Sequence, residues 1–95
     1  MPGIQPTAWG TLTARNITAA TVIKAEPGVP LIAQVIVAGT TAGAIYDASS
    51  ISGNVVANQV AVIPETVGAY RIEMPCAAGI LIVPGTGQTL AVSYA

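Results

Sequence analysis

The side chains able to do chemistry are few and scattered in this chain of 95 residues. It contains no histidine, which removes the Ser-His-Asp and Cys-His arrangements and the commonest metal ligand. Carboxylates remain, and two of them could in principle form the acid–base pair of a glycosidase. They are Glu26, Asp47, Glu65 and Glu73.

The surroundings of these carboxylates favour structural roles. Glu26 and Glu65 each lie beside a proline in a turn signal, and Asp47 precedes an Ala-Ser-Ser stretch that is typical of an Asx turn. Glu73 shares a polar strand face with Arg71, and a solvated pair of this kind stabilises by under about 1 kcal/mol. We therefore expect no catalytic residue, and the chain is predicted not to be an enzyme.

The remaining reactive features also have structural interpretations. Cys76 is the only cysteine, so an internal disulfide is excluded and a small buried hydrophobe is expected. The glycine-rich run at 85–87 lies between two β-rich runs, whereas a phosphate cradle needs a helix N-terminus after the glycines. We expect a turn there, and neither a cofactor nor a metal site.

The scarcity of charge is the most informative feature of the composition. Charged residues make up 7% of the chain and hydrophobic residues 53%, whereas about 25% charged residues is usual for soluble domains. Much of the surface must then be neutral and polar, or be covered by partners. We favour partners because exposed apolar patches usually mark interfaces; a Thr/Ala-rich surface in contact with water is the alternative.

Other partners and locations are disfavoured. The net charge is −1 and no basic patch is present, so nucleic acid is not an expected partner. No apolar run approaches the ~20 residues of a membrane helix, and residues 1–6 lack the features of a signal peptide. We expect neither a membrane partner nor secretion, and a protein that works where it is made or leaves the cell by lysis.

Turn signals recur along the chain at intervals of about 8–13 residues, the spacing typical of a β-sandwich or barrel. Runs rich in Val, Ile and Thr lie between them, and no stretch has the apolar spacing of a helix. The predicted fold is all-β, an antiparallel β-sandwich or jelly-roll-like domain. Strands are expected near 9–14, 17–25, 30–37, 44–47, 54–63, 69–74, 79–83 and 88–94.

Three of these strands carry more specific predictions. Residues 79–95 are expected to form a hairpin about the turn at 84–88, with Leu90, Val92 and Tyr94 on one face of its second strand. The run 31–37 is apolar on both faces, which predicts a central strand with one face in the core and the other covered by a partner or by the N-terminal arm.

The strand at 69–74 alternates in polarity. Tyr70, Ile72 and Met74 are expected to face the core, while Arg71 and Glu73 face water.

The first residues are predicted to form an extended arm over 1–8, followed by the β-sandwich domain over 9–95. Prolines at positions 2 and 6 favour extended backbone; a disordered terminus is the alternative. Ile4 and Trp9 would anchor the arm on a neighbouring subunit. The candidate interface consists of Ile4, Trp9, Leu12, Ile32, Ile36 and Ile51.

Sugar binding stays open as a minor alternative. A sugar site needs exposed aromatic platforms, and this chain offers only four aromatic residues, two of them in core-facing registers. They are Trp9, Tyr46, Tyr70 and Tyr94.

Three stretches together resemble a known group of proteins. They are residues 17–28 (ITAATVIKAEPG), residues 44–53 with their Tyr-Asp and Ser-Gly elements, and residues 75–87 (PCAAGILIVPGTG), which lead into a final Val-Ser-Tyr. The pattern is similar to that of short virion proteins of tailed bacteriophages, the head decoration or cement proteins. The resemblance covers residues 17–95 and leaves residues 1–16 outside it.

The resemblance implies a β-sandwich or jelly-roll module on the capsid exterior. Its partners would be further copies of itself, as a homotrimer, and a major capsid protein whose neighbouring subunits it clamps. The expected location is the virion, with the host cytoplasm during assembly. A fibre, neck or tail component of the same virion is the alternative, and no catalytic residue is carried over.

Overall fold

The computed structural model describes residues 11–95 and builds them into strands joined by turns and two short 3-10 helices. The elements are β1 (Leu12–Ile17), β2 (Thr21–Lys24), β3 (Pro30–Val37), β4 (Gly43–Asp47), η2 (Ile51–Gly53), η3 (Val56–Asn58), β5 (Gln59–Ile63), β6 (Gly68–Arg71), β7 (Ile80–Val83) and β8 (Thr89–Tyr94). The predicted arm over 1–8 lies outside the described residues, as do Ile4 and Trp9.

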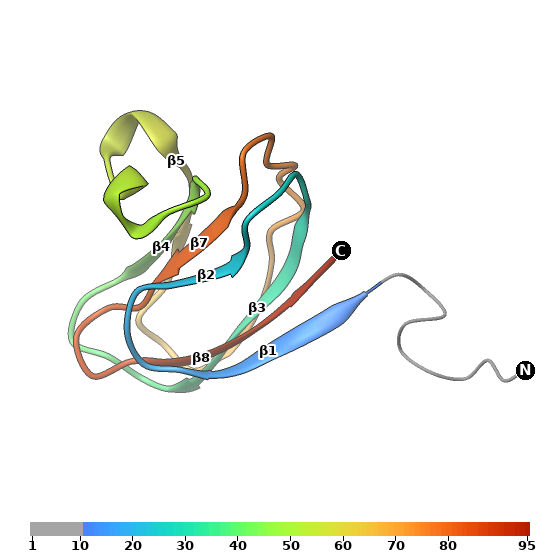
Figure 1. Cartoon of the computed structure of the whole chain (residues 1–95). Coiled ribbons are helices and arrows are strands. Elements are labelled where there is room, and N and C mark those ends of the chain that lie inside the picture. Colours follow the sequence, from blue (N-terminus) through green and yellow to red (C-terminus); the bar gives the residue numbers. More distant parts are fainter. Residues whose placement is uncertain (1–10) are drawn as a thin grey trace, which may run out of the picture.

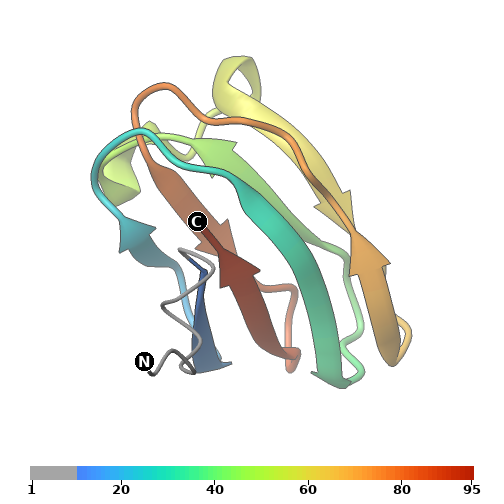
Figure 2. The same cartoon turned by 90° about the vertical axis from the view of Figure 1, so that its right-hand side faces the viewer.

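The strands form two antiparallel four-stranded sheets that pack face to face (Figures 1 and 2). One sheet has the order β1-β8-β3-β6 and the other the order β2-β7-β4-β5. The predicted all-β, antiparallel architecture compatible with a β-sandwich is therefore confirmed. β3 lies between β8 and β6, which confirms the prediction of a central strand from its apolar sequence.

The core lies between the sheets and is built from aliphatic side chains that alternate along the strands. One sheet contributes Ile45, Ile63, Ile80 and Ile82, and the other contributes Ile17, Ala33, Val35, Leu90 and Val92. Most of these side chains are fully buried. Their β-branched shapes suit a pleated, close-packed surface, which explains why these short runs form strands.

The predicted C-terminal hairpin is wrong, although both of its strands exist. β7 belongs to one sheet and β8 to the other, so the turn at 84–88 carries the chain across the sandwich. Gln88 explains the crossing, because its side chain is 1% exposed and joins two loops. Its Oε1 accepts from the Gly85 N–H at 2.9 Å, and its Nε2 donates to the Pro64 carbonyl at 2.8 Å.

Four predicted strands differ by several residues from those observed. The predicted 17–25 strand is reduced to β2 (Thr21–Lys24), and Ile17 belongs to β1. β1 starts and ends later than the predicted 9–14, and 3-10 turns occupy the first part of the predicted 54–63 strand. β6 stops at Arg71, before the predicted end at residue 74. Beyond it Glu73 has a φ of 51°, which ends the alternation. Met74 is consequently 45% exposed rather than facing the core as predicted.

Candidate interaction surface

The Asp47 carboxylate holds the loop that precedes β7. It accepts hydrogen bonds from the backbone N–H groups of Ala77 at 3.0 Å, Ala78 at 2.7 Å and Gly79 at 3.3 Å. The predicted local Asx turn is therefore wrong, because the carboxylate bonds to residues 30 or more positions away. These donors, Ala77 first, lower the pKa of Asp47 below its ordinary value of 3.8.

Cys76 packs in the hydrophobic core with an exposed fraction of 3%, as predicted for a buried thiol. Burial, together with the negative charge of nearby Asp47, raises the pKa of this thiol to about 11. The thiol therefore stays neutral near pH 7 and packs as a small hydrophobe.

The other charged side chains lie at the surface. Arg71 Nε lies 3.4 Å from Glu73 Oε2, and these side chains are 78% and 51% exposed, so the pair is solvated as predicted. Glu26 and Glu65 are exposed in separate loops. Within residues 11–95 no cluster of three His, Cys, Asp or Glu side chains could hold a metal ion, and no pocket is found.

Apolar side chains lie uncovered on the outer face of the β1-β8-β3-β6 sheet, the face turned toward the viewer in Figure 2. Ile32 and Ile36 of β3 are 43% and 51% exposed. The register shifts between Val35 and Val37, and this bulge leaves Val37 49% exposed beside Ile36. Val67, which precedes β6, is 60% exposed. We call Ile32, Ile36, Val37 and Val67 the β3–β6 face.

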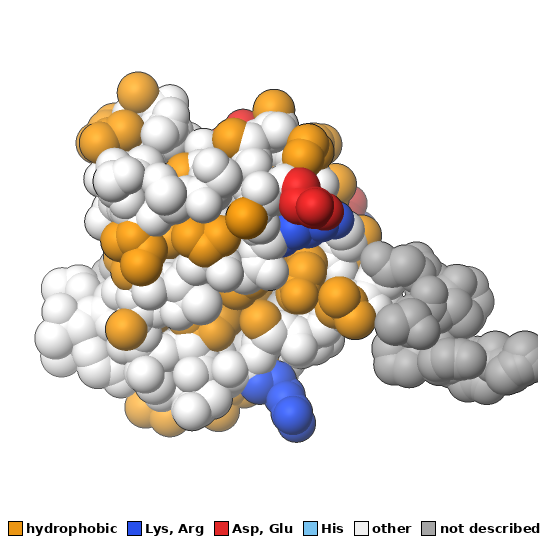
Figure 3. Space-filling model, in the orientation of Figure 1, with side chains coloured by type: hydrophobic (Ala, Val, Ile, Leu, Met, Phe, Trp, Pro, Cys, Tyr) orange, Lys and Arg blue, Asp and Glu red, His pale blue; other side chains and the backbone are white. Residues whose placement is uncertain are grey.

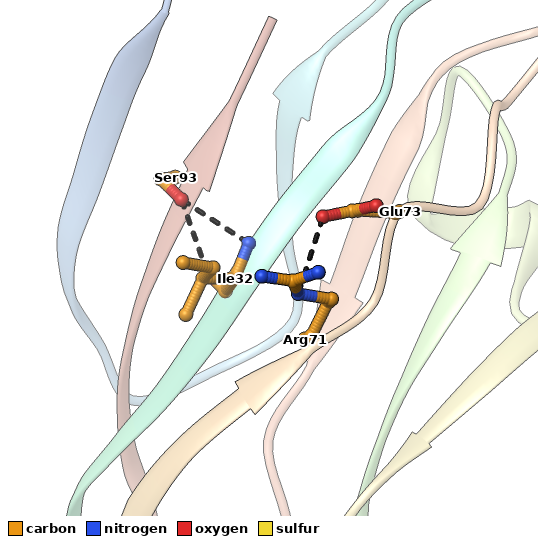
Figure 4. Close-up of polar contacts among 4 residues, drawn as sticks. All are labelled: Ile32, Arg71, Glu73 and Ser93. Atoms are coloured by element: carbon orange, nitrogen blue, oxygen red, sulfur yellow. Dashed lines mark hydrogen bonds and ion pairs between the residues drawn. The ribbon is translucent and has the colours of Figure 1, made fainter.

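Ile32 is held at one end of this face by its neighbours on both sides (Figure 4). Its backbone N–H donates to Ser93 Oγ at 3.1 Å, and Ser93 lies on the adjacent strand β8. On the other side Ile32 pairs with Arg71, whose guanidinium is engaged by Glu73. Ionic side chains thus border the apolar patch at this end and neutralise each other.

The rest of this outer face is almost free of charge. Among the strands β1, β8, β3 and β6 the charged residues are Arg15 and Arg71. Between them the outward positions carry small neutral side chains, with Ala91 and Ala69 flanking Gln34. A neutral sheet face with exposed aliphatic side chains can be desolvated without breaking ion pairs, which suits a docking surface.

A second apolar surface lies on the opposite side of the sandwich, over the β2-β7-β4-β5 sheet (Figure 1). It is formed by residues 48–64, a stretch without a charged residue, which we call the 48–64 segment. Its exposed side chains are Ile51 at 54%, Val55 at 49%, Val56 at 84% and Val62 at 60%. Figure 3 shows hydrophobic side chains gathered over the 3-10 helices of this segment.

The predicted interface residues therefore fall in different places. Ile32 and Ile36 lie together on the β3–β6 face, and Ile51 lies on the 48–64 segment. Leu12 pairs with Tyr94 near the start of β1 and is 48% exposed. Ile4 and Trp9 lie outside the described residues.

Sequence reasoning missed several exposed aliphatic residues. They are Val37, Val55, Val56, Val62 and Val67. The absence of charge from 48 to 64 could have indicated that Val55, Val56 and Val62 are exposed. The bulge that exposes Val37 has no local sequence signature.

The three tyrosines in the described part of the chain are half-buried. Tyr70 donates its hydroxyl to the Thr66 carbonyl at 2.7 Å, and both Tyr70 and Tyr94 pack against the core. Tyr70 and Tyr94 therefore make structural contacts within the sandwich.

No known protein family, curated protein or solved structure matches this chain. Across residues 11–95, no helix has the length and apolar character needed to cross a membrane.

Proposed function

We propose that this chain is a structural virion protein, a decoration or cement protein that binds the outside of a tailed-phage head and clamps neighbouring capsid subunits. The observation that carries the proposal is the β3–β6 face, where exposed aliphatic side chains lie on a neutral, regular sheet. Ile32 and Ile36 of this face were expected as contacts from the sequence, and they are 43% and 51% exposed.

The strand order supports the proposal at the level of architecture. The orders β1-β8-β3-β6 and β2-β7-β4-β5 are compatible with a jelly-roll-like sandwich, because every pair of successive strands except β4 and β5 crosses between the two sheets. This double-sheet arrangement is used by viral capsid and lectin domains. Fold alone does not identify a function, so the resemblance of residues 17–95 to decoration proteins is the second support.

Binding would proceed by laying the open sheet face on the shell. Burying exposed aliphatic side chains gains roughly 25 cal/mol per Å² of apolar surface removed from water. A standard interface buries about 1,600 Å² in total, and a clamp that spans two capsid subunits divides this area between them. Repetition over the shell then adds avidity that one weak contact lacks.

Co-sedimentation with purified capsids that lack this chain tests the proposal. Ile36→Asp places a charge on the β3–β6 face and should abolish binding. Ile51→Asp is a matched control on the opposite side, with 54% exposure against 51%, and should bind like the wild type. Failure of the wild type to bind capsids, or equal binding by both variants, would contradict the proposal.

Two other results would redirect the assignment. Binding to isolated tails and not to heads would favour a fibre, neck or tail component. Selective retention on a glycan array would favour a sugar-binding module, because a cement protein should show no sugar preference.

A further inference from the structure

The edges of the two sheets differ in how they are protected. A sheet edge presents unpaired backbone groups, and proteins guard it with charged residues, bulges or short strands. β1 carries Arg15, β2 carries Lys24 and β6 carries Arg71, while β2 and β6 have only four residues each. β5, the remaining edge, carries no charge and pairs with β4 alone among the described strands.

The last residues of β5 form regular strand, and the edge of β5 that faces away from β4 is the one available for further pairing. The register with β4 skips Val60, while Ala61, Val62 and Ile63 pair in sequence. Val62 points away from the core and is 60% exposed, and Ile63 is buried. Residues 61–63 therefore offer an uninterrupted, uncharged stretch of strand whose outward side chain, Val62, is apolar.

We infer that β5 is a self-association edge, at which the β5 strands of two copies pair antiparallel about a twofold axis near Val62. A twofold interface places the same patch of both copies in contact, so the patch must complement itself. β5 and the whole 48–64 segment meet this condition because they are uncharged. The same pairing at β1, β2 or β6 brings two cations into one short ladder, which is unfavourable.

Pairing of two copies at β5 would need more surface than the strand alone. A stable interface needs about 800 Å² from each partner, roughly a sixth of the accessible surface of 5057 Å². A five-residue strand does not supply this alone. Val55 and Val56 lie just before β5 and are 49% and 84% exposed, so they extend the apolar surface beside the paired strands.

This pairing leaves the β3–β6 face free, because the two surfaces lie on opposite sheets. It does not depend on capsid binding, and it differs from the threefold assembly that the resemblance implies. A twofold pair gives twice the chain mass of 9.5 kDa, and a trimer gives three times that mass.

Sedimentation and light scattering of the protein alone test the inference, and no capsid is needed. The wild type should pass from monomer to dimer as its concentration rises. Val62→Lys should raise the dimer dissociation constant by at least about tenfold, because the twofold axis brings two lysines together. Val67→Lys has the same chemistry at the same 60% exposure on the other face, and should dimerise like the wild type.

Cysteine crosslinking reports the register independently of affinity. Val62→Cys should form a disulfide-linked dimer under mild oxidation, because residues opposed across a strand pair lie within disulfide reach. Val67→Cys should form no disulfide-linked dimer under the same conditions. Native Cys76 does not interfere because it is 3% exposed.

A wild type that stays monomeric, a trimer unaffected by Val62→Lys, or equal crosslinking of the two cysteine variants would overturn the inference. Capsid co-sedimentation then separates the two proposals. If Val62→Lys binds capsids and Val67→Lys does not, two distinct surfaces are established. If the wild type dimerises but binds no capsid, the proposed function fails and the β5 pairing stands.

Discussion

The two outer faces of the sandwich both carry apolar side chains on a central strand, but one face is covered and the other is exposed. β3 and β7 are both central strands, and each is apolar on both of its faces. Leu81 of β7 points away from the core, paired with Val22 and Tyr46, yet it is 0% exposed. Ile32 of β3 occupies the corresponding outward position and is 43% exposed.

The difference comes from where the rest of the chain goes. Residues 48–58 leave the sheet after β4 and lie on its outer side, as Figure 1 shows. The Ala48 N–H donates to the Gly79 carbonyl at 3.2 Å, and Asp47 holds the same loop. The chain thus covers one outer face with its own residues and leaves the other exposed to solvent.

Truncating Leu81 should give the largest effect on stability. Leu81→Ala removes a fully buried side chain and should lower the free energy of unfolding by about 2–5 kcal/mol. Ile32→Ala on the open face should cost under about 1 kcal/mol, because water already reaches that side chain. Denaturant titration measures both, and equal losses would mean that the two faces do not differ as described.

A substitution that crowds the covering segment, residues 48–58, should give the next largest loss of stability. A Cβ at Gly53 would overlap the Cβ of Ala48, so Gly53→Ala must displace Gly53 or Ala48, and the Ala48 N–H is what anchors the covering segment to Gly79. We expect a loss of about 1–3 kcal/mol. Hydrogen exchange should show faster exchange in β7 than in β3. Ser49→Ala, at an exposed neighbouring position, adds no atoms and should leave both strands protected.

Neutralising Asp47 should have a smaller effect that depends on pH. The pKa of Asp47 is lowered in the folded state, so its contribution is complete above the unfolded value and is lost as pH falls through the folded value. Asp47→Asn should cost about 1–2 kcal/mol at pH 7. It should also flatten the loss of stability below about pH 4, measured by denaturant titration at several pH values.

An Asp47→Asn variant with an unchanged acid profile would show that the carboxylate contributes nothing to holding the loop. Asp47→Glu is a useful companion variant, because it keeps the charge but displaces the oxygens from the three N–H donors.

The smallest effect on stability is expected on the open face. Val67→Thr is nearly isosteric and should change the free energy of unfolding by under about 0.5 kcal/mol. Its capsid affinity should nevertheless fall several-fold, since about 0.8 kcal/mol accompanies each buried methyl-sized group. Val56→Thr on the 48–64 segment should keep wild-type capsid affinity. Binding isotherms compare the two, and the reverse order would assign the shell contact to the other face.

The strands could be predicted from the sequence because their signals are local. Runs of Val, Ile and Thr between proline and glycine turns located all eight strands, and β3 has the predicted bounds. Sheet membership could not be predicted, because the turn at 84–88 looks the same whether it closes a hairpin or crosses a sandwich. The contact that decides it, between Gln88 and the Pro64 carbonyl, joins residues 24 positions apart.

The candidate surface could be predicted from the sequence only in part. The apolar pattern of β3 predicted that its outer face meets something, and Ile32 and Ile36 are indeed exposed. The same pattern in β7 belongs to a face that the chain covers itself. A two-sided apolar strand therefore indicates that both faces need cover, but the source of the cover depends on distant residues such as 48–58.

The alternation of strands between sheets also constrains how the chain folds. Among the strands of residues 11–95, β4 and β5 alone are neighbours both in sequence and in a sheet, so theirs is the one ladder there that closes locally. Within the described part of the chain β1 pairs only with β8, so this ladder must wait during translation until residues 89–94 leave the ribosome. Such non-local pairing predicts refolding on the slow, millisecond-to-second scale of all-β domains. Over that interval the uncharged β5 edge is exposed to other nascent copies, which makes chain concentration during synthesis a determinant of yield.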